Sequence, residues 1–277
     1  MIIGHQKQRQ YLAKLADSGK ISHALLFAGQ DQLGKKTVAL EFAKSLIKEE
    51  FRGDQHPDLI LVGREAGESE IKIAQIRDLI WKLSLRPYSA PWKIAVLDEA
   101  DRMTKDAQNC FLKTLEEPTL KTLVILVSSH PNQLLPTILS RCQIVKFYPV
   151  PGSEIESYLQ KEGLDRVKIE EVSDLAAGRP GRLMEILRDP EKMAEAKAMV
   201  KELQEAMVKN LAFRFQLAKT LADRDNFQET LDVWQNFLRK DVIKNANPLK
   251  QIQNINYFLL NTNVSPRLAL EILMLEI

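Results

Sequence analysis

The sequence has little cysteine and no long apolar run, and each absence excludes a class of protein. Only two of the 277 residues are cysteine, Cys110 and Cys142, which is too few for a disulfide framework or a four-thiolate zinc site. No stretch approaches the roughly 18 apolar residues of a membrane span, and the amino terminus lacks the apolar segment of a signal peptide. We therefore expect a soluble, cytoplasmic protein with no membrane contact.

The sequence also lacks an excess of charge of one sign. It carries 39 basic and 37 acidic side chains, a formal net charge of +2. This near balance excludes a polybasic nucleic-acid binder, although it does not exclude a local basic strip. The hydrophobic content of 45% is ordinary for a globular protein. Because an average domain has about 150 residues, the length predicts two domains or three small ones.

Short apolar runs alternate with helix-like segments in the first half of the chain. The strand candidates are residues 23–27, 59–62, 93–97, 123–127 and 144–147. Between them, apolar residues recur at helical spacing, as over residues 73–83, and Thr104 is a candidate helix cap. Because parallel strands need crossover connections, this alternation predicts an α/β domain over residues 1–149, with a parallel sheet covered on both faces.

The pattern changes at the proline-rich stretch 149–152, which predicts a domain boundary. No strand candidate follows. Asp189-Pro190 and Ser265-Pro266 are typical helix starts, and apolar residues recur at spacings of three and four. We therefore predict a small helical domain over residues 150–189 and an all-helical domain over residues 190–277.

A glycine-rich segment after the first strand candidate matches a phosphate-binding loop, with one deviation. It runs from Gly29 through Gly34 and Lys35 to Thr37. The glycines would let backbone N–H groups curl around phosphate oxygens, and Lys35 would reach the β- and γ-phosphates. The motif needs Ser or Thr directly after that lysine to hold Mg²⁺. Lys36 stands there instead, and Thr37 comes one residue late.

The deviation leaves nucleotide binding open. One alternative is a loop that still binds ATP or ADP, with Mg²⁺ only when a nucleotide is bound. A second is a phosphate loop that is now vestigial. A third is a plain glycine turn that caps the strand. Because the ammonium of Lys36 would repel a metal ion, we do not expect efficient hydrolysis at this site.

Two carboxylates follow the third strand candidate, Asp98 and Glu99. They fall at the carboxyl end of a buried strand, where α/β sheets bind ligands. In nucleotide-hydrolysing proteins the first such acid holds Mg²⁺ and the second polarises the attacking water. A solvated turn is the alternative, but the position after a phosphate loop favours the nucleotide-site interpretation.

With these motifs assembled, the chain resembles the delta-prime family of bacterial clamp-loader subunits, which are P-loop proteins of the AAA+ class. The resemblance is dense over residues 1–190 and thinner in the tail, where it depends on Ser265–Glu271. The matching segments are His23–Phe27, Gly29–Thr37, His56–Leu59, Ile73–Arg77, Asp98–Asp101, Asn109–Pro118 and Leu134–Gln143.

The resemblance implies a subunit of the DNA polymerase III hetero-pentamer that loads the sliding clamp onto primed DNA, with delta and gamma/tau-like subunits as neighbours. The two helical regions would be a lid domain and an oligomerisation collar. Arg141, in Ser-Arg-Cys, would be an arginine finger for a neighbour's ATP site, since a guanidinium stabilises charge on a transferring phosphoryl group. The pair Ser128-Ser129 matches a polar sensor position near the nucleotide, with a simple turn as the alternative. Arg182 matches the sensor arginine of the lid domain, with a surface charge at a helix start as the alternative. Cys142 is expected to be a buried side chain and not a nucleophile.

Three other interpretations stay open. The chain could be an ATP-hydrolysing AAA+ subunit of the same loader, a DNA-remodelling ATPase of another class, or a scaffold with a vestigial site. The first two would normally carry a hydroxyl residue directly after Lys35, and the sequence has Lys36. Some clamp-loader subunits carry a four-cysteine zinc module, but residues 47–55 contain no cysteine, so no zinc is expected.

Overall fold

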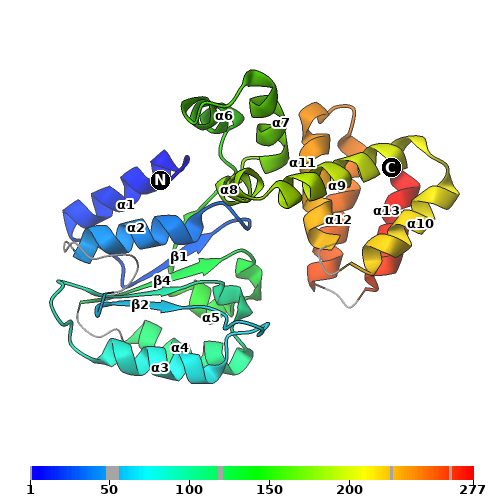
Figure 1. Cartoon of the computed structure of the whole chain (residues 1–277). Helices are drawn as coiled ribbons and strands as arrows, with labels where there is room; N and C mark the ends of the chain where they lie inside the picture. Colours follow the sequence, from blue (N-terminus) through cyan, green and yellow to red (C-terminus); the bar gives the residue numbers. More distant parts are fainter. Residues whose placement is uncertain (1, 48–55, 118–120, 225–226, 262–263) are drawn as a thin grey trace. The chain divides into compact units, whose positions relative to one another are not determined.

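The computed structural model describes residues 2–47, 56–117, 121–224, 227–261 and 264–277 (Figure 1). Contacts between residues group the chain into two compact units. The first is Met1–Pro151 with Arg179–Gly181, and the second is Gly152–Gly178 with Arg182–Ile277. The main division thus falls at the proline-rich stretch, while the finer division into domains 1–149, 150–189 and 190–277 stays a prediction.

A five-stranded parallel sheet forms the centre of the first unit, which confirms the predicted α/β class. Its strand order is β2-β3-β4-β1-β5, and every neighbouring pair is parallel. β1, β3 and β4 are buried along their whole length because both faces of the sheet are covered. The strands are β1 (Ala24–Ala28), β2 (Leu59–Val62), β3 (Lys93–Leu97), β4 (Thr122–Ser128) and β5 (Gln143–Lys146).

Helices cover the two faces of this sheet (Figure 1). Successive strand side chains point to opposite faces, so Leu25 packs in a core that includes Phe42 of α2, whereas Leu26 packs in the core of Phe111 of α4. α1 (Gln6–Ser18) and α2 (Lys35–Ile47) lie on one face; α3 (Ile73–Ser84), α4 (Lys105–Glu116) and α5 (Pro136–Leu139) lie on the other.

Two of the predicted helix starts are confirmed in detail. The Thr104 side chain accepts a hydrogen bond from the Ala107 N–H at 3.2 Å and caps α4. Asp189 caps α9 by accepting from the Glu191 N–H at 2.9 Å. The last helix begins at Pro266 as predicted, but Ser265 makes no side-chain capping bond there.

The described part of the second unit consists of helices and short helical turns, with no strand. Its core is centred on Trp234, which is fully buried and donates its Nε1–H to the Met199 carbonyl at 2.7 Å. None of the helices described is both long enough and apolar enough to cross a bilayer. The helices that follow residue 151, of which α8 begins in the segment assigned to the first unit, are α6 (Gly152–Lys161), α7 (Arg166–Ala176), α8 (Pro180–Arg188), α9 (Pro190–Val208), α10 (Leu211–Ala222), α11 (Phe227–Leu238), α12 (Ala246–Asn261) and α13 (Pro266–Glu276).

Candidate functional site

The phosphate loop connects β1 to α2 at the carboxyl end of the sheet. A Cβ on Gly29 would lie 2.5 Å from the Phe147 carbonyl oxygen, so only glycine fits there. Gly34 has a φ of +85°, a backbone conformation that favours glycine. The loop is also held at Gln32, whose carbonyl accepts a hydrogen bond from the Gly181 N–H at 2.7 Å. The loop predicted from the sequence is therefore present and fixed by its own packing.

The Lys35 ammonium is turned into the loop. It donates to the carbonyl oxygens of Gly29 and Gln30, each at 2.6 Å, and to the Ser129 hydroxyl at 3.0 Å. The residue is buried, with 5% of its surface exposed. All three donors of the ammonium have partners in this arrangement, so a phosphate would have to replace some of these contacts.

The electrostatics at Lys35 follow from this burial. Loss of solvent lowers the pKa of Lys35, because a low-dielectric environment disfavours the charged amine. The carboxylates of Asp31, Asp101 and Asp98 oppose this shift, and the guanidinium of Arg179 adds to it. The pKa of Lys35 nevertheless lies below its ordinary value. An anion bound at this point would raise it again.

Lys36, at the position of the missing hydroxyl, pairs with the first strand-end acid. Its Nζ lies 3.0 Å from Asp98 Oδ2. The other oxygen of Asp98 accepts the Glu99 N–H at 3.1 Å. The pair is accessible to solvent, with 54% of the Lys36 side chain and 24% of the Asp98 side chain exposed. Thr37 is exposed on the next position of α2.

These residues do not fit a bound Mg²⁺. Magnesium takes oxygen ligands in near-octahedral geometry, but position 36 offers an ammonium, and Asp98 already contacts that cation. In the described ranges, no group of three or more His, Cys, Asp or Glu is placed to hold a metal. Residues 48–55, noted for their lack of cysteine, lie outside the described part of the chain.

The second acid is also paired with a cation. Arg64 donates from Nε and Nη2 to the two carboxylate oxygens of Glu99, both at 2.6 Å. This bidentate bond raises the pKa of Arg64. Arg64 was not predicted from the sequence, although a signal exists there. It follows Gly63 after β2, the strand beside β3, and the carboxyl ends of neighbouring parallel strands share one edge.

The serine pair after β4 divides between two environments. Ser128 has 1% of its surface exposed, and its hydroxyl makes no hydrogen bond to any described residue. Ser129 instead accepts from Lys35, donates its hydroxyl to Asp31 and donates its N–H to Asp101 at 3.0 Å. Of the predicted pair, the structure thus places Ser129 and not Ser128 beside the loop lysine, because successive residues of an extended chain face opposite ways. A sensor role for either stays a prediction.

The two buried arginines near residue 180 belong to different units. Arg179 groups with the α/β unit and acts on Lys35. Arg182 groups with the helical unit, where its Nη2 lies 3.8 Å from Glu229 Oε1. The structure therefore brings Arg179 to the phosphate loop, while the sensor role of Arg182 stays a prediction.

Arg141 lies between α5 and β5, at the surface of the α/β unit. It donates from Nη2 to Glu116 Oε1 at 2.6 Å and from Nη1 to the Thr137 carbonyl at 2.8 Å and the Ser140 hydroxyl at 3.3 Å. About a third of the side chain, 32%, is exposed. A guanidinium has five N–H donors, so these contacts orient Arg141 without using all of them.

Cys142, next to Arg141, is unsuited to nucleophilic chemistry. Burial raises the pKa of its thiol to about 12. A thiol with so high a pKa is protonated at neutral pH, whereas the nucleophile is the thiolate. This agrees with the expectation that Cys142 serves packing.

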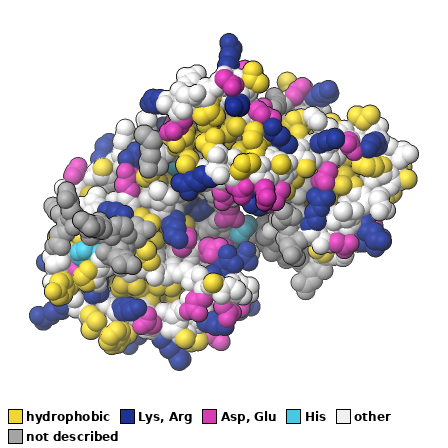
Figure 2. Space-filling model, viewed as in Figure 1, with side chains coloured by type: hydrophobic (Ala, Val, Ile, Leu, Met, Phe, Trp, Pro, Cys, Tyr) yellow, Lys and Arg dark blue, Asp and Glu magenta, His cyan; other side chains and the backbone are white. Residues whose placement is uncertain are grey.

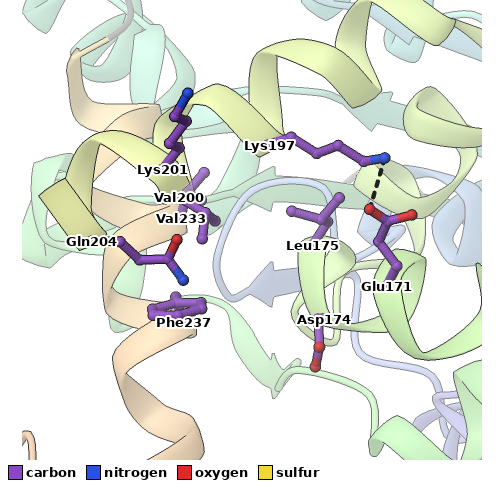
Figure 3. Close-up of a pocket in the computed structure, with 9 residues that line it drawn as sticks. All are labelled: Glu171, Asp174, Leu175, Lys197, Val200, Lys201, Gln204, Val233 and Phe237. Atoms are coloured by element: carbon purple, nitrogen blue, oxygen red, sulfur yellow. Dashed lines mark ion pairs between the residues drawn. The ribbon is translucent and has the colours of Figure 1, made fainter. Parts of the chain in front are cut away.

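A separate pocket of about 210 Å³ lies in the helical unit, among α7, α9 and α11 (Figure 3). Lys197 and Glu171 form an ion pair at its side, 2.7 Å apart. Drug-sized ligands usually occupy pockets of about 300 Å³ or more, and this one has no glycine-rich loop, so we do not assign it to the nucleotide. It is lined by Glu171, Asp174, Leu175, Lys197, Val200, Lys201, Gln204, Val233 and Phe237.

Charge on the surface is mixed. Figure 2 shows basic side chains scattered among acidic ones over the face in view. This agrees with the formal net charge of +2. On this face, the side chains of the described residues therefore form no broad field of one sign.

The comparisons with known proteins decide the family. A family model described as "DNA polymerase III, delta subunit" matches residues 4–151. The chain belongs to this family. It is 32% identical over 205 residues to the DNA polymerase III subunit delta' of Bacillus subtilis strain 168, which is 69% of this chain and 61% of the relative. It is 31% identical to a Replication factor C small subunit of Staphylothermus marinus, over 59% of this chain and 50% of the relative.

The matched regions span between half and about three fifths of these relatives' own length. Among solved structures, the Holliday junction branch migration motor RuvB of Thermotoga maritima covers 96% of this chain and 87% of its own, with a TM-score of 0.52 and 15% identity. At that identity the likeness shows the fold alone. Together with the parallel sheet and the phosphate loop, these findings confirm the predicted P-loop, AAA+ fold class.

Proposed function

We propose that the chain is a delta-prime-type subunit of the bacterial replicative clamp loader, and that it assists ATP hydrolysis in a neighbouring subunit more than in its own site. The family match and the names of the relatives support this proposal. The partners we propose are delta and gamma/tau-like subunits in a hetero-pentamer, the sliding clamp and, through the assembly, primed DNA. The complex would work in the cytoplasm.

The observation that carries the proposal is a contrast between two groups of charges. At the chain's own site both strand-end acids are paired with cations of the chain, Asp98 with Lys36 and Glu99 with Arg64. An acid that is paired in this way can hold Mg²⁺ or polarise water only after it has given up its cation. Arg141, in contrast, lies at the surface with donors to spare. Own ATPase activity is therefore weak or absent, and ATP or ADP is at most retained.

The contacts of Arg141 suit a finger that acts on another subunit. Thr137 and Glu116 hold the guanidinium at the carboxyl end of α5. In a loader, phosphate oxygens of a neighbour's nucleotide would compete with the Glu116 carboxylate for the same N–H donors. A planar guanidinium stabilises the charge that develops on the transferring phosphoryl group. Hydrolysis would then require contact between the two subunits.

A reconstituted loader with Arg141→Ala tests this role. We expect single-turnover hydrolysis at the neighbouring site to fall by about a thousandfold, the lower range for an arginine finger, while gel filtration shows normal assembly. Arg166→Ala is the matched control, since its side chain is 91% exposed and lies 3.8 Å from Glu170. Undiminished DNA-stimulated hydrolysis in an intact Arg141→Ala complex would refute the finger assignment.

The rival interpretation, an ATP-hydrolysing subunit, is tested on the isolated chain. Steady-state ATP turnover by the purified protein, sensitive to Lys35→Ala, would favour that rival. We expect no turnover above the background of a protein preparation carrying Lys35→Ala. This measurement does not depend on Arg141, so the two tests can fail independently.

A further inference from the structure

Lys36 lies where proteins of this fold hold a divalent ion. It is the residue directly after the loop lysine, on the first turn of α2. Its ammonium contacts the acid that follows β3, with 3.0 Å between Lys36 Nζ and Asp98 Oδ2. In the standard motif these same two positions would supply a hydroxyl and a carboxylate to Mg²⁺. Here they bind each other.

We propose that Lys36 is a built-in replacement for Mg²⁺ at Asp98: its ammonium keeps the metal out, and any phosphate ligand of the loop binds without metal. The inference deepens the proposed function, on which it rests for the idea of a weak own site. It concerns the chain's own loop, and so its test does not involve Arg141 or any partner.

Physical reasons favour the lysine over the metal. The ammonium is tethered to α2, so it needs no binding from solution, whereas Mg²⁺ gives up its water reluctantly. To reach Asp98, the metal would have to displace Lys36 and then remain beside its positive charge. The two positive charges of Mg²⁺ and the single charge of the Lys36 ammonium would repel each other strongly at so short a distance. The second oxygen of Asp98 already accepts the Glu99 N–H, so part of its acceptor capacity is in use.

The rest of the loop keeps the geometry of a phosphate site. Gly29 and Gly34 retain the close approach and the positive φ that the loop needs. Lys35 is buried, and its pKa is lowered by that burial. A single substitution, Lys36→Thr, would restore the complete motif, so that one residue decides whether the site takes a metal.

The experiment measures ADP binding to the full-length chain by calorimetry, once with MgCl₂ and once with EDTA. We expect Mg²⁺ not to lower the dissociation constant of the wild type, because Mg²⁺ draws ADP into a complex that this site excludes, and to lower that of Lys36→Thr at least about tenfold. Lys36→Gln separates the loss of charge from the gain of a hydroxyl. Mg²⁺ should increase its affinity for ADP by less than that of Lys36→Thr. If the wild type binds ADP in neither buffer, Mg²⁺-dependent binding by Lys36→Thr still supports the proposal.

Manganese provides a second readout. With Mn²⁺ and ADP, the electron paramagnetic resonance spectrum should show protein-bound metal for Lys36→Thr and not for the wild type. Tightening of wild-type binding by Mg²⁺ of about tenfold or more, removed by Thr37→Ala, would overturn the proposal and assign the metal to the shifted hydroxyl. So would a folded Lys36→Thr protein, checked by circular dichroism, that gains no dependence on the metal.

Discussion

The two ends of β3 each carry an aspartate–lysine pair, and the pairs differ in almost every physical respect. At the amino end, Lys93 lies 3.5 Å from Asp58, and the exposed fractions of the two side chains are 7% and 0%. At the carboxyl end, Lys36 lies 3.0 Å from Asp98, with half of the lysine exposed. The same two residue types thus form a buried pair and a solvated pair on one strand.

The difference lies in what else holds each acid. Asp58 accepts N–H groups of Tyr88, Ser89 and Ala90 at 2.7, 2.9 and 3.0 Å, in addition to Lys93. It ties the segment after α3 to the start of the sheet, so it cannot be released without local unfolding. The contacts that hold Asp98 are one hydrogen bond from the Glu99 N–H and one ion pair with the Lys36 ammonium. A ligand can therefore compete for the carboxyl end of the strand but not for the amino end.

The largest expected effect is that of Asp58→Asn. It leaves Lys93 buried without a counter-ion and turns an amide N–H₂ toward backbone donors. Breaking one partner out of a buried pair costs about 3 kcal/mol or more. Urea denaturation should therefore show a free energy of unfolding that is lower by about 3 kcal/mol.

Asp78→Asn is the matched control for that measurement. Asp78 lies on α3 and pairs with Lys82 at 2.7 Å, but both side chains are largely exposed. Loss of the Asp78 carboxylate should lower the free energy of unfolding by less than about 0.5 kcal/mol. Equal costs for the two variants would mean that burial does not distinguish the amino-end pair.

The pH dependence of stability gives a second, smaller effect. Burial alone would raise the pKa of Asp58, but the N–H groups of Ser89, Ala90 and Tyr88, with Lys93, outweigh it and hold that pKa below its ordinary value. A lowered folded pKa stabilises the protein above the unfolded pKa of about 3.9, and this contribution is lost as pH falls through the folded value.

The difference in unfolding free energy between wild type and Asp58→Asn should therefore be constant from neutral pH to about pH 5 and shrink below about pH 4. Chemical denaturation at a series of pH values measures it. Other acids titrate in both proteins and cancel in the difference. A difference that stays constant down to the acid limit of folding would show that Asp58 is not stabilised as its hydrogen bonds indicate.

Much of the sheet could be predicted from the sequence, because buried parallel strands are short, continuous apolar runs. The predicted 59–62 and 93–97 coincide with β2 and β3. The predicted 23–27 and 144–147 are each displaced by one residue from β1 and β5, and β4 extends one residue beyond 123–127 at each end. Several helices are not predicted, and two of them, α1 and α10, carry no clear pattern. In α1 only Leu12 is buried, and in α10 apolar residues occur around the whole helix, so neither shows one apolar stripe.

The candidate site was predictable where its chemistry is local in sequence and not where it depends on register. The loop and Asp98 follow from motifs, and the conflict at Lys36 is visible without a structure. Arg64 required the strand order, and the choice between Ser128 and Ser129 required the direction of each side chain at the strand end. The bond between Arg141 and Glu116 joins residues 25 apart in the chain. The spacing of residues within a helix or a strand does not predict such a contact.

The smallest expected effect is on the stability provided by the carboxyl-end pair. Lys36→Met removes an ammonium that is half exposed, so the free energy of unfolding should change by less than about 1 kcal/mol. Salt sharpens the contrast between the two ends. At about 1 M NaCl the screening length falls to about 3 Å, which should abolish most of the Lys36→Met effect and leave that of Asp58→Asn nearly intact. A salt-resistant loss of about 3 kcal/mol for Lys36→Met would mean that this pair, too, is part of the structural core and is not open to exchange with a ligand.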